Sequence, residues 1–161
     1  MSVTRVLVAN RGEIAVRVIR ACQSLGIETV AAVSDADRES MAAQMANRAV
    51  CIGPARSTDS YLKIENLMAA AQGTGCDALH PGYGFLSERA ALAQACSENN
   101  ITFIGPSAEN ISMMGDKLEA RKIARAAGVP LVPGSDHAKN PHEAARLAEQ
   151  IGYPLLLKAS A

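Results

Sequence analysis

Residues 80–88 read His80-Pro81-Gly82-Tyr83-Gly84-Phe85-Leu86-Ser87-Glu88, and they lie between a short apolar run and an alanine-rich segment. The apolar run predicts a strand and the alanine-rich segment a helix, so the stretch is predicted to be the loop that connects them. In open α/β sheets, this edge of the sheet is where ligands bind. Gly82 and Gly84 lack the Cβ atoms that would hold a ligand away from the backbone. The alternative is a packed structural loop in which Ser87 caps the helix.

Strands and helices alternate along the chain on both sides of this loop. Short apolar runs predict strands at residues 5–9, 28–34, 49–52, 76–79 and 102–104. Helical patterns are expected at residues 10–24, 40–46, 61–72 and 89–97. This alternation predicts an α/β fold with a mainly parallel sheet and helices on both of its faces, in a unit that closes near Met114.

The pattern changes after Met114. Asp116 is expected to cap a helix that ends at Gly128, and Asn140 is expected to cap another that runs to about Ile151. A final strand is expected at residues 155–158. The sequence stops there, before a second unit of this kind would be complete.

The first predicted strand is followed by a turn and a helix. Asn10 is expected to cap this helix, and Glu13 stands three residues later, as in a capping box. The turn lacks the G-x-G-x-x-G pattern with which a helix N-terminus holds a pyrophosphate, so no dinucleotide site is expected there. Arg17 and Arg20 fall on the side of the helix opposite its apolar stripe.

The composition excludes several classes of protein. The 161 residues include 16 basic and 16 acidic side chains, so no broad attraction to nucleic acid or membranes is expected. No run reaches the roughly 18 apolar residues of a membrane span, and the N-terminus lacks the profile of a signal peptide. The four cysteines lie far apart in the sequence. They are expected to be free thiols in a reducing compartment, either cytoplasmic or matrix-like, and a cytoplasmic location is the one expected here.

Seven stretches resemble, in the same order, the amino-terminal part of biotin carboxylase, the ATP-grasp component of biotin-dependent carboxylases. They are residues 9–15, 34–37, 80–88, 103–106, 114–117, 127–130 and 152–160. The resemblance covers essentially the whole chain, and the loop at residues 80–88 carries its most specific motif.

The resemblance implies a Rossmann-like pre-ATP-grasp domain at residues 1–114 and the beginning of an ATP-grasp domain at residues 115–161. It also implies the reaction of the family, in which ATP and bicarbonate give carboxyphosphate and the carboxyl group moves to biotin. ATP and Mg²⁺ would be the cofactors, and biotin the carried substrate. Cations must neutralise the phosphates, and closure must exclude water because carboxyphosphate would otherwise hydrolyse.

The resemblance also assigns roles to individual residues. Lys117 and Lys158 match lysines that contact ATP, while Tyr83 and Gly84 match the border of the biotin and bicarbonate pocket. No catalytic group and no metal ligand is expected within these residues. The carboxylates for Mg²⁺ and the groups that bind bicarbonate and biotin are expected beyond Ala161.

Other matched residues are expected to support the structure. His80 and Gly82 are expected to hold the loop, with His80 making a structural hydrogen bond; the alternative for His80 is a general base. Arg17 and Arg20 match positions at the subunit interface of dimeric members. Ser24 stands where the family often has an acidic residue, so a solvated helix face is the alternative.

The implied partners are a biotin carboxyl carrier protein or domain, a carboxyltransferase and a second copy of the chain. The final acceptor, an acyl-CoA, pyruvate or urea, would be chosen by the carboxyltransferase. Two other functions compete. One is another ATP-grasp ligase, which should not carry the loop at residues 80–88. The other is a non-catalytic assembly module that docks through the helix of Arg17 and Arg20.

Overall fold

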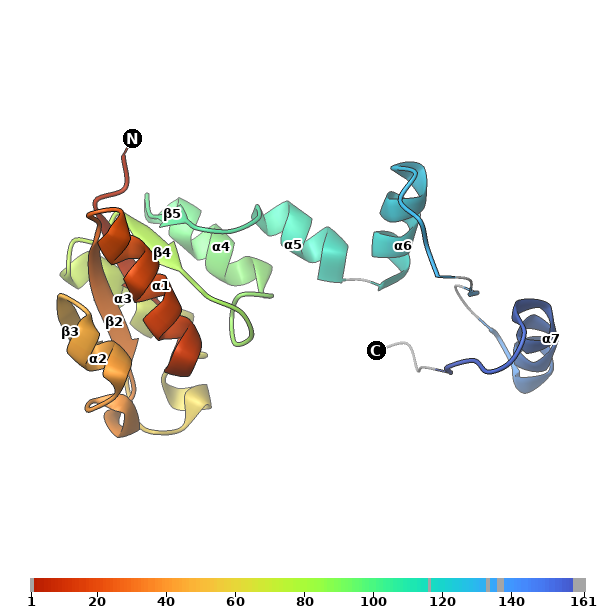
Figure 1. The fold of residues 1–161 in the computed structure, drawn as a ribbon, viewed down its shortest axis with the longest axis horizontal. Helices are drawn as coiled ribbons and strands as arrows, with labels where there is room; N and C mark the ends of the chain where they lie inside the picture. The colour runs from red at the N-terminus through yellow and green to blue at the C-terminus, as the bar shows by residue number, and fades with distance from the viewer. Residues whose placement is uncertain (1, 116, 133, 136–137, 158–161) are drawn as a thin grey trace. The chain divides into compact units, whose positions relative to one another are not determined.

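The computed structural model describes residues 2–115, 117–132, 134–135 and 138–157 (Figure 1). The chain divides into two compact units, Met1–Gly115 and Asp116–Ala161. The first unit contains a five-stranded sheet in the order β3-β2-β1-β4-β5, in which all neighbouring strands are parallel. Its strands are β1 (Arg5–Val8), β2 (Glu28–Val33), β3 (Arg48–Cys51), β4 (Ala78–His80) and β5 (Thr102–Phe103). The predicted parallel sheet is confirmed.

Helices cover both faces of the sheet, as predicted (Figure 1). They are α1 (Gly12–Ser24), α2 (Met41–Met45), α3 (Ile64–Gly73) and α4 (Ala90–Glu98). A further helix, α5 (Ala108–Gly115), contacts α4 and buries no residue against the sheet. Because side chains alternate across a strand, Val6 and Val8 of β1 join the apolar cluster of α1 and α2. Leu7 points the other way, into the cluster of α3 and α4. The central strand is therefore apolar on both faces, as expected for a parallel sheet.

The start of one helix, α3, differs from the sequence prediction, and so does the capping of α4. The helix expected from residue 61 begins only at Ile64, because Tyr61 is buried in the core and its hydroxyl group donates to Asp37. A short 3₁₀ helix, η2 (Ser57–Asp59), precedes it. The cap at Ser87, which belonged to the alternative of a purely structural loop, is not formed, because α4 begins at Ala90 and its N-cap residue, Arg89, makes no side-chain bond.

Helix α5 was not predicted from the sequence. The hydroxyl group of Ser107 accepts a hydrogen bond of 3.2 Å from the backbone of Asn110, which is the bond of a helix cap. The strand before it, β5, is shorter than expected and contains only two residues.

The second unit contains α6 (Lys117–Ala126) and α7 (Pro141–Ile151) among its described residues. The predicted cap of α7 is confirmed, since Oδ1 of Asn140 accepts a hydrogen bond of 2.9 Å from the backbone of Glu143. Residues 155–157, where a strand was expected, form no strand. Asp116 and Lys158 lie outside the described residues.

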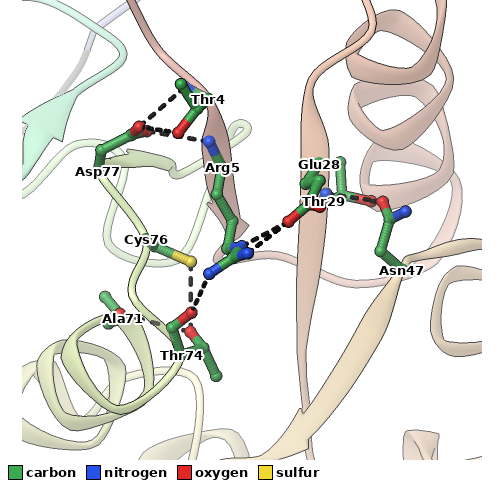
Figure 2. A network of polar contacts seen from close by, with 9 residues as sticks. All are labelled: Thr4, Arg5, Glu28, Thr29, Asn47, Ala71, Thr74, Cys76 and Asp77. Atoms are coloured by element: carbon green, nitrogen blue, oxygen red, sulfur yellow. Dashed lines mark hydrogen bonds and ion pairs between the residues drawn. The ribbon is translucent and has the colours of Figure 1, made fainter.

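A polar network joins the amino ends of three strands (Figure 2). The Arg5 guanidinium group donates to Glu28 at the start of β2, with a shortest distance of 2.6 Å, and to the carbonyl oxygen of Thr74 at 2.8 Å. The Asp77 carboxylate accepts from the backbone of Thr4 at 2.8 Å and from that of Arg5 at 3.1 Å. These bonds fix the start of β1 against β2 and β4, at the edge opposite the loop of residues 80–88. No helix in the described part of the chain is long and apolar enough to cross a membrane.

Candidate functional site

Three neighbouring strands end at the carboxyl edge of the sheet, and each is followed by a polar segment. Val8 of β1 lies opposite His80 of β4 on one side, and opposite Ala31 of β2 on the other. The residues that follow these strands therefore meet at one edge. They include a short 3₁₀ helix, η1 (Asp35–Asp37), after β2. A cleft of about 270 Å³ lies there, lined by Asn10, Arg11, Glu13, Ile14, Tyr83, Gly84 and Phe85.

Asn10 holds the loop of residues 80–88 and does not cap α1. Its buried side-chain amide donates to the carbonyl oxygens of Pro81, at 2.7 Å, and Tyr83, at 2.9 Å. Its Oδ1 accepts from the adjacent backbone of Arg11. Helix α1 begins at Gly12 without a side-chain cap bond, so the predicted cap and capping box are wrong. The Asn10 side chain is instead fully used in joining two loops.

His80 and Gly82 are joined inside the loop. The backbone N–H of Gly82 donates to Nδ1 of His80 at 3.0 Å. Gly82 has a φ of +65°, and a Cβ atom there would lie 2.7 Å from Nδ2 of Asn10. Any larger residue would therefore be strained and would collide with the side chain that holds the loop. Burial lowers the pKa of His80, so its imidazole is neutral and can accept this bond.

Tyr83 stands at the rim of the cleft and is tied to α1. Its hydroxyl group donates to Oε1 of Glu13 at 2.6 Å, while the residue as a whole is 64% exposed. The hydrogen bond to Glu13, with the negative charge of that carboxylate, raises the pKa of Tyr83, against the opposing charge of Arg17. The phenol is therefore a neutral donor. Next to it, Gly84 has a φ of +66° and open space where a Cβ would be.

A buried carboxylate, Asp37, lies behind the cleft. Its Oδ1 accepts from the Arg11 guanidinium group at 2.8 Å. Its Oδ2 accepts from the hydroxyl groups of Tyr61 and Ser34, each at 2.8 Å. Burial raises the pKa of Asp37, but the hydrogen bonds from Tyr61 and Ser34 and the charge of Arg11 outweigh it and hold the pKa below its ordinary value. The carboxylate is therefore ionised at neutral pH.

Sequence reasoning did not find Asp37 or Tyr61. The sequence predicts Tyr61 on a helix, but Tyr61 precedes α3. Its ring is stacked on Phe85 of the loop, with centroids 5.3 Å apart. One signal was available for Asp37: it follows a strand that ends at the ligand-binding edge of the sheet. The burial of Asp37 could not be predicted from the sequence, because the turn contains two aspartates with the same local pattern. Of these, Asp35 is exposed and Asp37 is buried.

The other predicted site residues lie elsewhere. Arg17 and Arg20 are exposed on α1 and do not line the cleft. Lys117 begins α6, but its side chain lies outside the described part of the chain, as does the whole of Lys158. Within the described ranges, no group of three or more histidine, cysteine, aspartate or glutamate side chains could hold a metal ion.

Two protein families match the chain. The family described as "Biotin carboxylase, N-terminal domain" matches residues 2–111. The family described as "Carbamoyl-phosphate synthase L chain, ATP binding domain" matches residues 116–161. Between them, these matches cover both compact units.

Curated relatives and solved structures resemble the chain along its whole length. Biotin carboxylase 1 of Bacillus subtilis is 56% identical over 160 residues, which are 99% of this chain and 36% of that protein. Biotin carboxylase of Pseudomonas aeruginosa is 51% identical over 97% of this chain and 35% of that protein. The biotin carboxylase domain of Hydrogenobacter thermophilus 2-oxoglutarate carboxylase, a dimer in complex with MgADP, ADP and bicarbonate, matches with a TM-score of 0.88 and 49% identity. The match covers 99% of this chain and 35% of that one. The chain thus spans about a third of the length of these relatives.

Proposed function

The chain belongs to the biotin carboxylase family, and on this premise we propose that the intact protein carboxylates biotin with ATP and bicarbonate. The observation that carries the proposal is the family match over residues 2–111, which includes the whole cleft and its supporting residues. Another ATP-grasp ligase is disfavoured, because the relatives with 51% and 56% identity are both biotin carboxylases.

The cleft is proposed to form one border of the pocket for biotin and bicarbonate. Tyr83 and Gly84 line it, and the Tyr83 hydroxyl group, which donates its proton to Glu13, keeps an oxygen lone pair that can accept a hydrogen bond from a ligand. Gly84 lets a ligand approach the backbone, since nothing lies within 4 Å of the position of its missing Cβ. These two residues would position the ligand, while His80 and Gly82 would keep the loop in shape.

ATP is proposed to bind through the second unit, which matches an ATP-binding domain family. Lys117 and Lys158 are proposed to contact its phosphates, because cations must neutralise the charge that develops during phosphoryl transfer. Mg²⁺, which bridges the phosphates when bound, is proposed to be held by carboxylates outside these 161 residues. The structure of a relative with 49% identity was solved in complex with MgADP and bicarbonate, which supports ATP, Mg²⁺ and bicarbonate as the ligands.

The proposed partners follow from the same reaction. Carboxybiotin must be carried to a second active site, so a biotin carboxyl carrier protein or domain and a carboxyltransferase are proposed. A homodimer is proposed because the solved relative from Hydrogenobacter thermophilus is a dimer. Arg17 and Arg20, which are exposed on α1, are proposed to lie at its interface. A cytoplasmic location is proposed as well, and the four free cysteines are consistent with it.

The experiment is a carboxylation assay with free biotin, in which ATP cleavage is followed with and without bicarbonate. The intact protein should cleave ATP only with bicarbonate, and faster when biotin is added. The polypeptide Met1–Ala161 alone should show no such cleavage, because the groups proposed to hold Mg²⁺ and bicarbonate are not in it. Bicarbonate-independent cleavage by the intact protein would contradict the proposed function.

Lys117 gives a sharper test of the assignment of ATP to the second unit. Lys117→Ala in the intact protein should raise the KM for ATP by about tenfold or more, as expected for loss of one charged contact, and change the KM for biotin little. Lys122→Ala is the matched control, because Lys122 is an exposed lysine of the same helix that pairs with Glu119. Equal changes in both KM values, or none, would show that the assignment is wrong.

A further inference from the structure

The two walls of the cleft come from different parts of the chain. Arg11 stands at the turn between β1 and α1, and Phe85 stands in the loop after β4. A ligand between them would be held only if the walls keep a fixed separation, since catalysis and binding depend on position to within about 1 Å.

One buried carboxylate is connected to both walls. Asp37 binds the Arg11 guanidinium group directly through Oδ1. Through Oδ2 it binds the hydroxyl group of Tyr61, whose ring is stacked on Phe85 with an angle of 3° between the planes. Asp37 itself does not line the cleft. Its influence on a ligand would therefore pass through Arg11 and Phe85.

The connection is rigid at each step. Tyr61 is 1% exposed, and its hydroxyl group is held twice, because it donates to Asp37 and accepts from the backbone of Ser34 at 3.0 Å. The Arg11 guanidinium group also lies over the Tyr61 ring, 5.9 Å from its centroid, in the geometry of a cation–π contact. Arg11 and the loop are thus both held by Tyr61 and Asp37.

We propose that Asp37 is a positioning residue for the ligand of the cleft, acting through Arg11 on one wall and through Tyr61 and Phe85 on the other. The inference rests on the proposed function, in which this ligand is biotin or bicarbonate. Ser34 belongs to the same hydrogen-bond network, because its hydroxyl group donates to Asp37 and its backbone N–H donates to the Tyr61 hydroxyl group. Because Asp37 does not line the cleft, the proposed role is that of a positioning residue and not of a catalytic one.

The test is Asp37→Asn in the intact protein, which keeps the size of the side chain and removes its charge. The KM for biotin should rise about tenfold, the expected loss for one charged hydrogen bond, while the KM for ATP stays within about twofold. Asp35→Asn is the matched control, because Asp35 lies in the same turn but is exposed and pairs with Arg38, away from the cleft. A general loss of folded enzyme would lower kcat and leave both KM values unchanged.

Two further variants separate the two walls. Tyr61→Phe removes one hydroxyl group and keeps the ring on Phe85, so it should raise the KM for biotin by a smaller factor. In a background of Arg11→Ala, the effect of Asp37→Asn should shrink, because part of it passes through Arg11. If Asp37→Asn does not fold, the KM for biotin of Tyr61→Phe tests the inference instead. A KM for biotin in Asp37→Asn or Tyr61→Phe equal to that of Asp35→Asn would overturn the inference.

Amide hydrogen exchange of residues 80–88 gives a measurement that does not need turnover. Exchange should become faster in Asp37→Asn and in Tyr61→Phe but remain at the wild-type rate in Asp35→Asn. Absence of biotin-dependent turnover in the wild type would refute the proposed function but not the role of Asp37. Amide hydrogen exchange of residues 80–88 would then test whether Asp37 positions the loop. Unchanged exchange in all three variants would overturn the inference whatever the activity.

Discussion

The Asn10 side chain determines how the loop of residues 80–88 is held, because it is the donor for two of the loop's carbonyl oxygens. A buried amide with bonded donors and acceptor fixes geometry in a way that apolar contacts do not. Gly82 is the complementary residue, since its missing Cβ leaves room for the Asn10 amide. The shape of the cleft thus depends on a pair of residues 72 positions apart in the sequence.

His80 makes the loop sensitive to acid. Burial lowers its pKa in the folded chain, whereas an unfolded histidine titrates near pH 6.5. Below about pH 6.5 the unfolded chain therefore binds a proton that the folded chain does not, and stability falls as the pH falls towards the folded pKa. His80→Asn keeps an acceptor for Gly82 without a titrating group. It should lose less free energy of unfolding than the wild type between pH 7.5 and pH 5, measured by urea denaturation.

His142→Asn is the control for this prediction, because His142 is an exposed histidine of α7, outside the loop. It should retain the pH dependence of the wild type. If His80→Asn and the wild type lose the same free energy on acidification, titration of His80 does not limit the stability of the fold.

At the scale of elements, the two edges of the sheet are held by different polar groups. The amino edge carries the Arg5 and Asp77 network, in which the strand starts are bound to one another (Figure 2). The carboxyl edge carries loops bound by Asn10 and Asp37. Because the amino edge is fixed by bonds that do not involve the cleft, variants there should change stability without changing ligand binding.

Asp77→Ala tests this separation. The backbone N–H groups of Thr4 and Arg5 would lose their acceptor, so the free energy of unfolding should fall by about 1–3 kcal/mol. Burial raises the pKa of Asp77, but hydrogen bonds from Thr4 and Arg5 outweigh it and lower the pKa. Its contribution is therefore present above the unfolded pKa of about 3.9 and is lost as the pH falls through the folded value. Urea denaturation at pH 7 and near pH 3 measures both effects.

Glu65→Ala is the comparison, since the ion pair of Glu65 with Lys63 spans 4.0 Å between exposed side chains. Its loss should change stability by no more than about 0.5 kcal/mol. A change in Asp77→Ala as small as this would show that the network is not needed to hold the strand starts. A rise in the KM for biotin in Asp77→Ala would show that the amino and carboxyl edges of the sheet are coupled.

The five strands of the first unit and the helices that connect them could be predicted in order from the sequence, because apolar runs and helical periods reflect local chemistry. The start of α3 could not, since Tyr61 fits a helical pattern as well as the core position that it occupies beneath Phe85. Asn10 was expected to cap a helix for the same reason. An asparagine at a strand–helix turn has the local chemistry of a cap, and only the distant loop gives it better partners. The motif at residues 80–88 indicated the site, whereas the buried groups behind it depend on tertiary contacts.

At the scale of the whole molecule, the proposed reaction needs more than one unit. The first unit carries the cleft, the second matches an ATP-binding family, and the chain spans about a third of its relatives. Arg17 and Arg20 occupy the exposed side of α1, so they are free to contact another copy of the chain. An interface that contained both arginines would bury positive charge, which is stable only against carboxylates or other acceptors of the partner.

Reversal of these charges should therefore break the proposed homodimer. Arg17→Glu combined with Arg20→Glu in the intact protein is expected to shift sedimentation from a dimer to a monomer at micromolar concentration. Arg89→Glu is the control, because Arg89 is also exposed but precedes α4, on the other face of the sheet. A dimer that persists in the double variant would place the interface elsewhere and leave α1 as a solvated face. A monomer with full biotin-dependent turnover would show that the cleft works without a partner subunit.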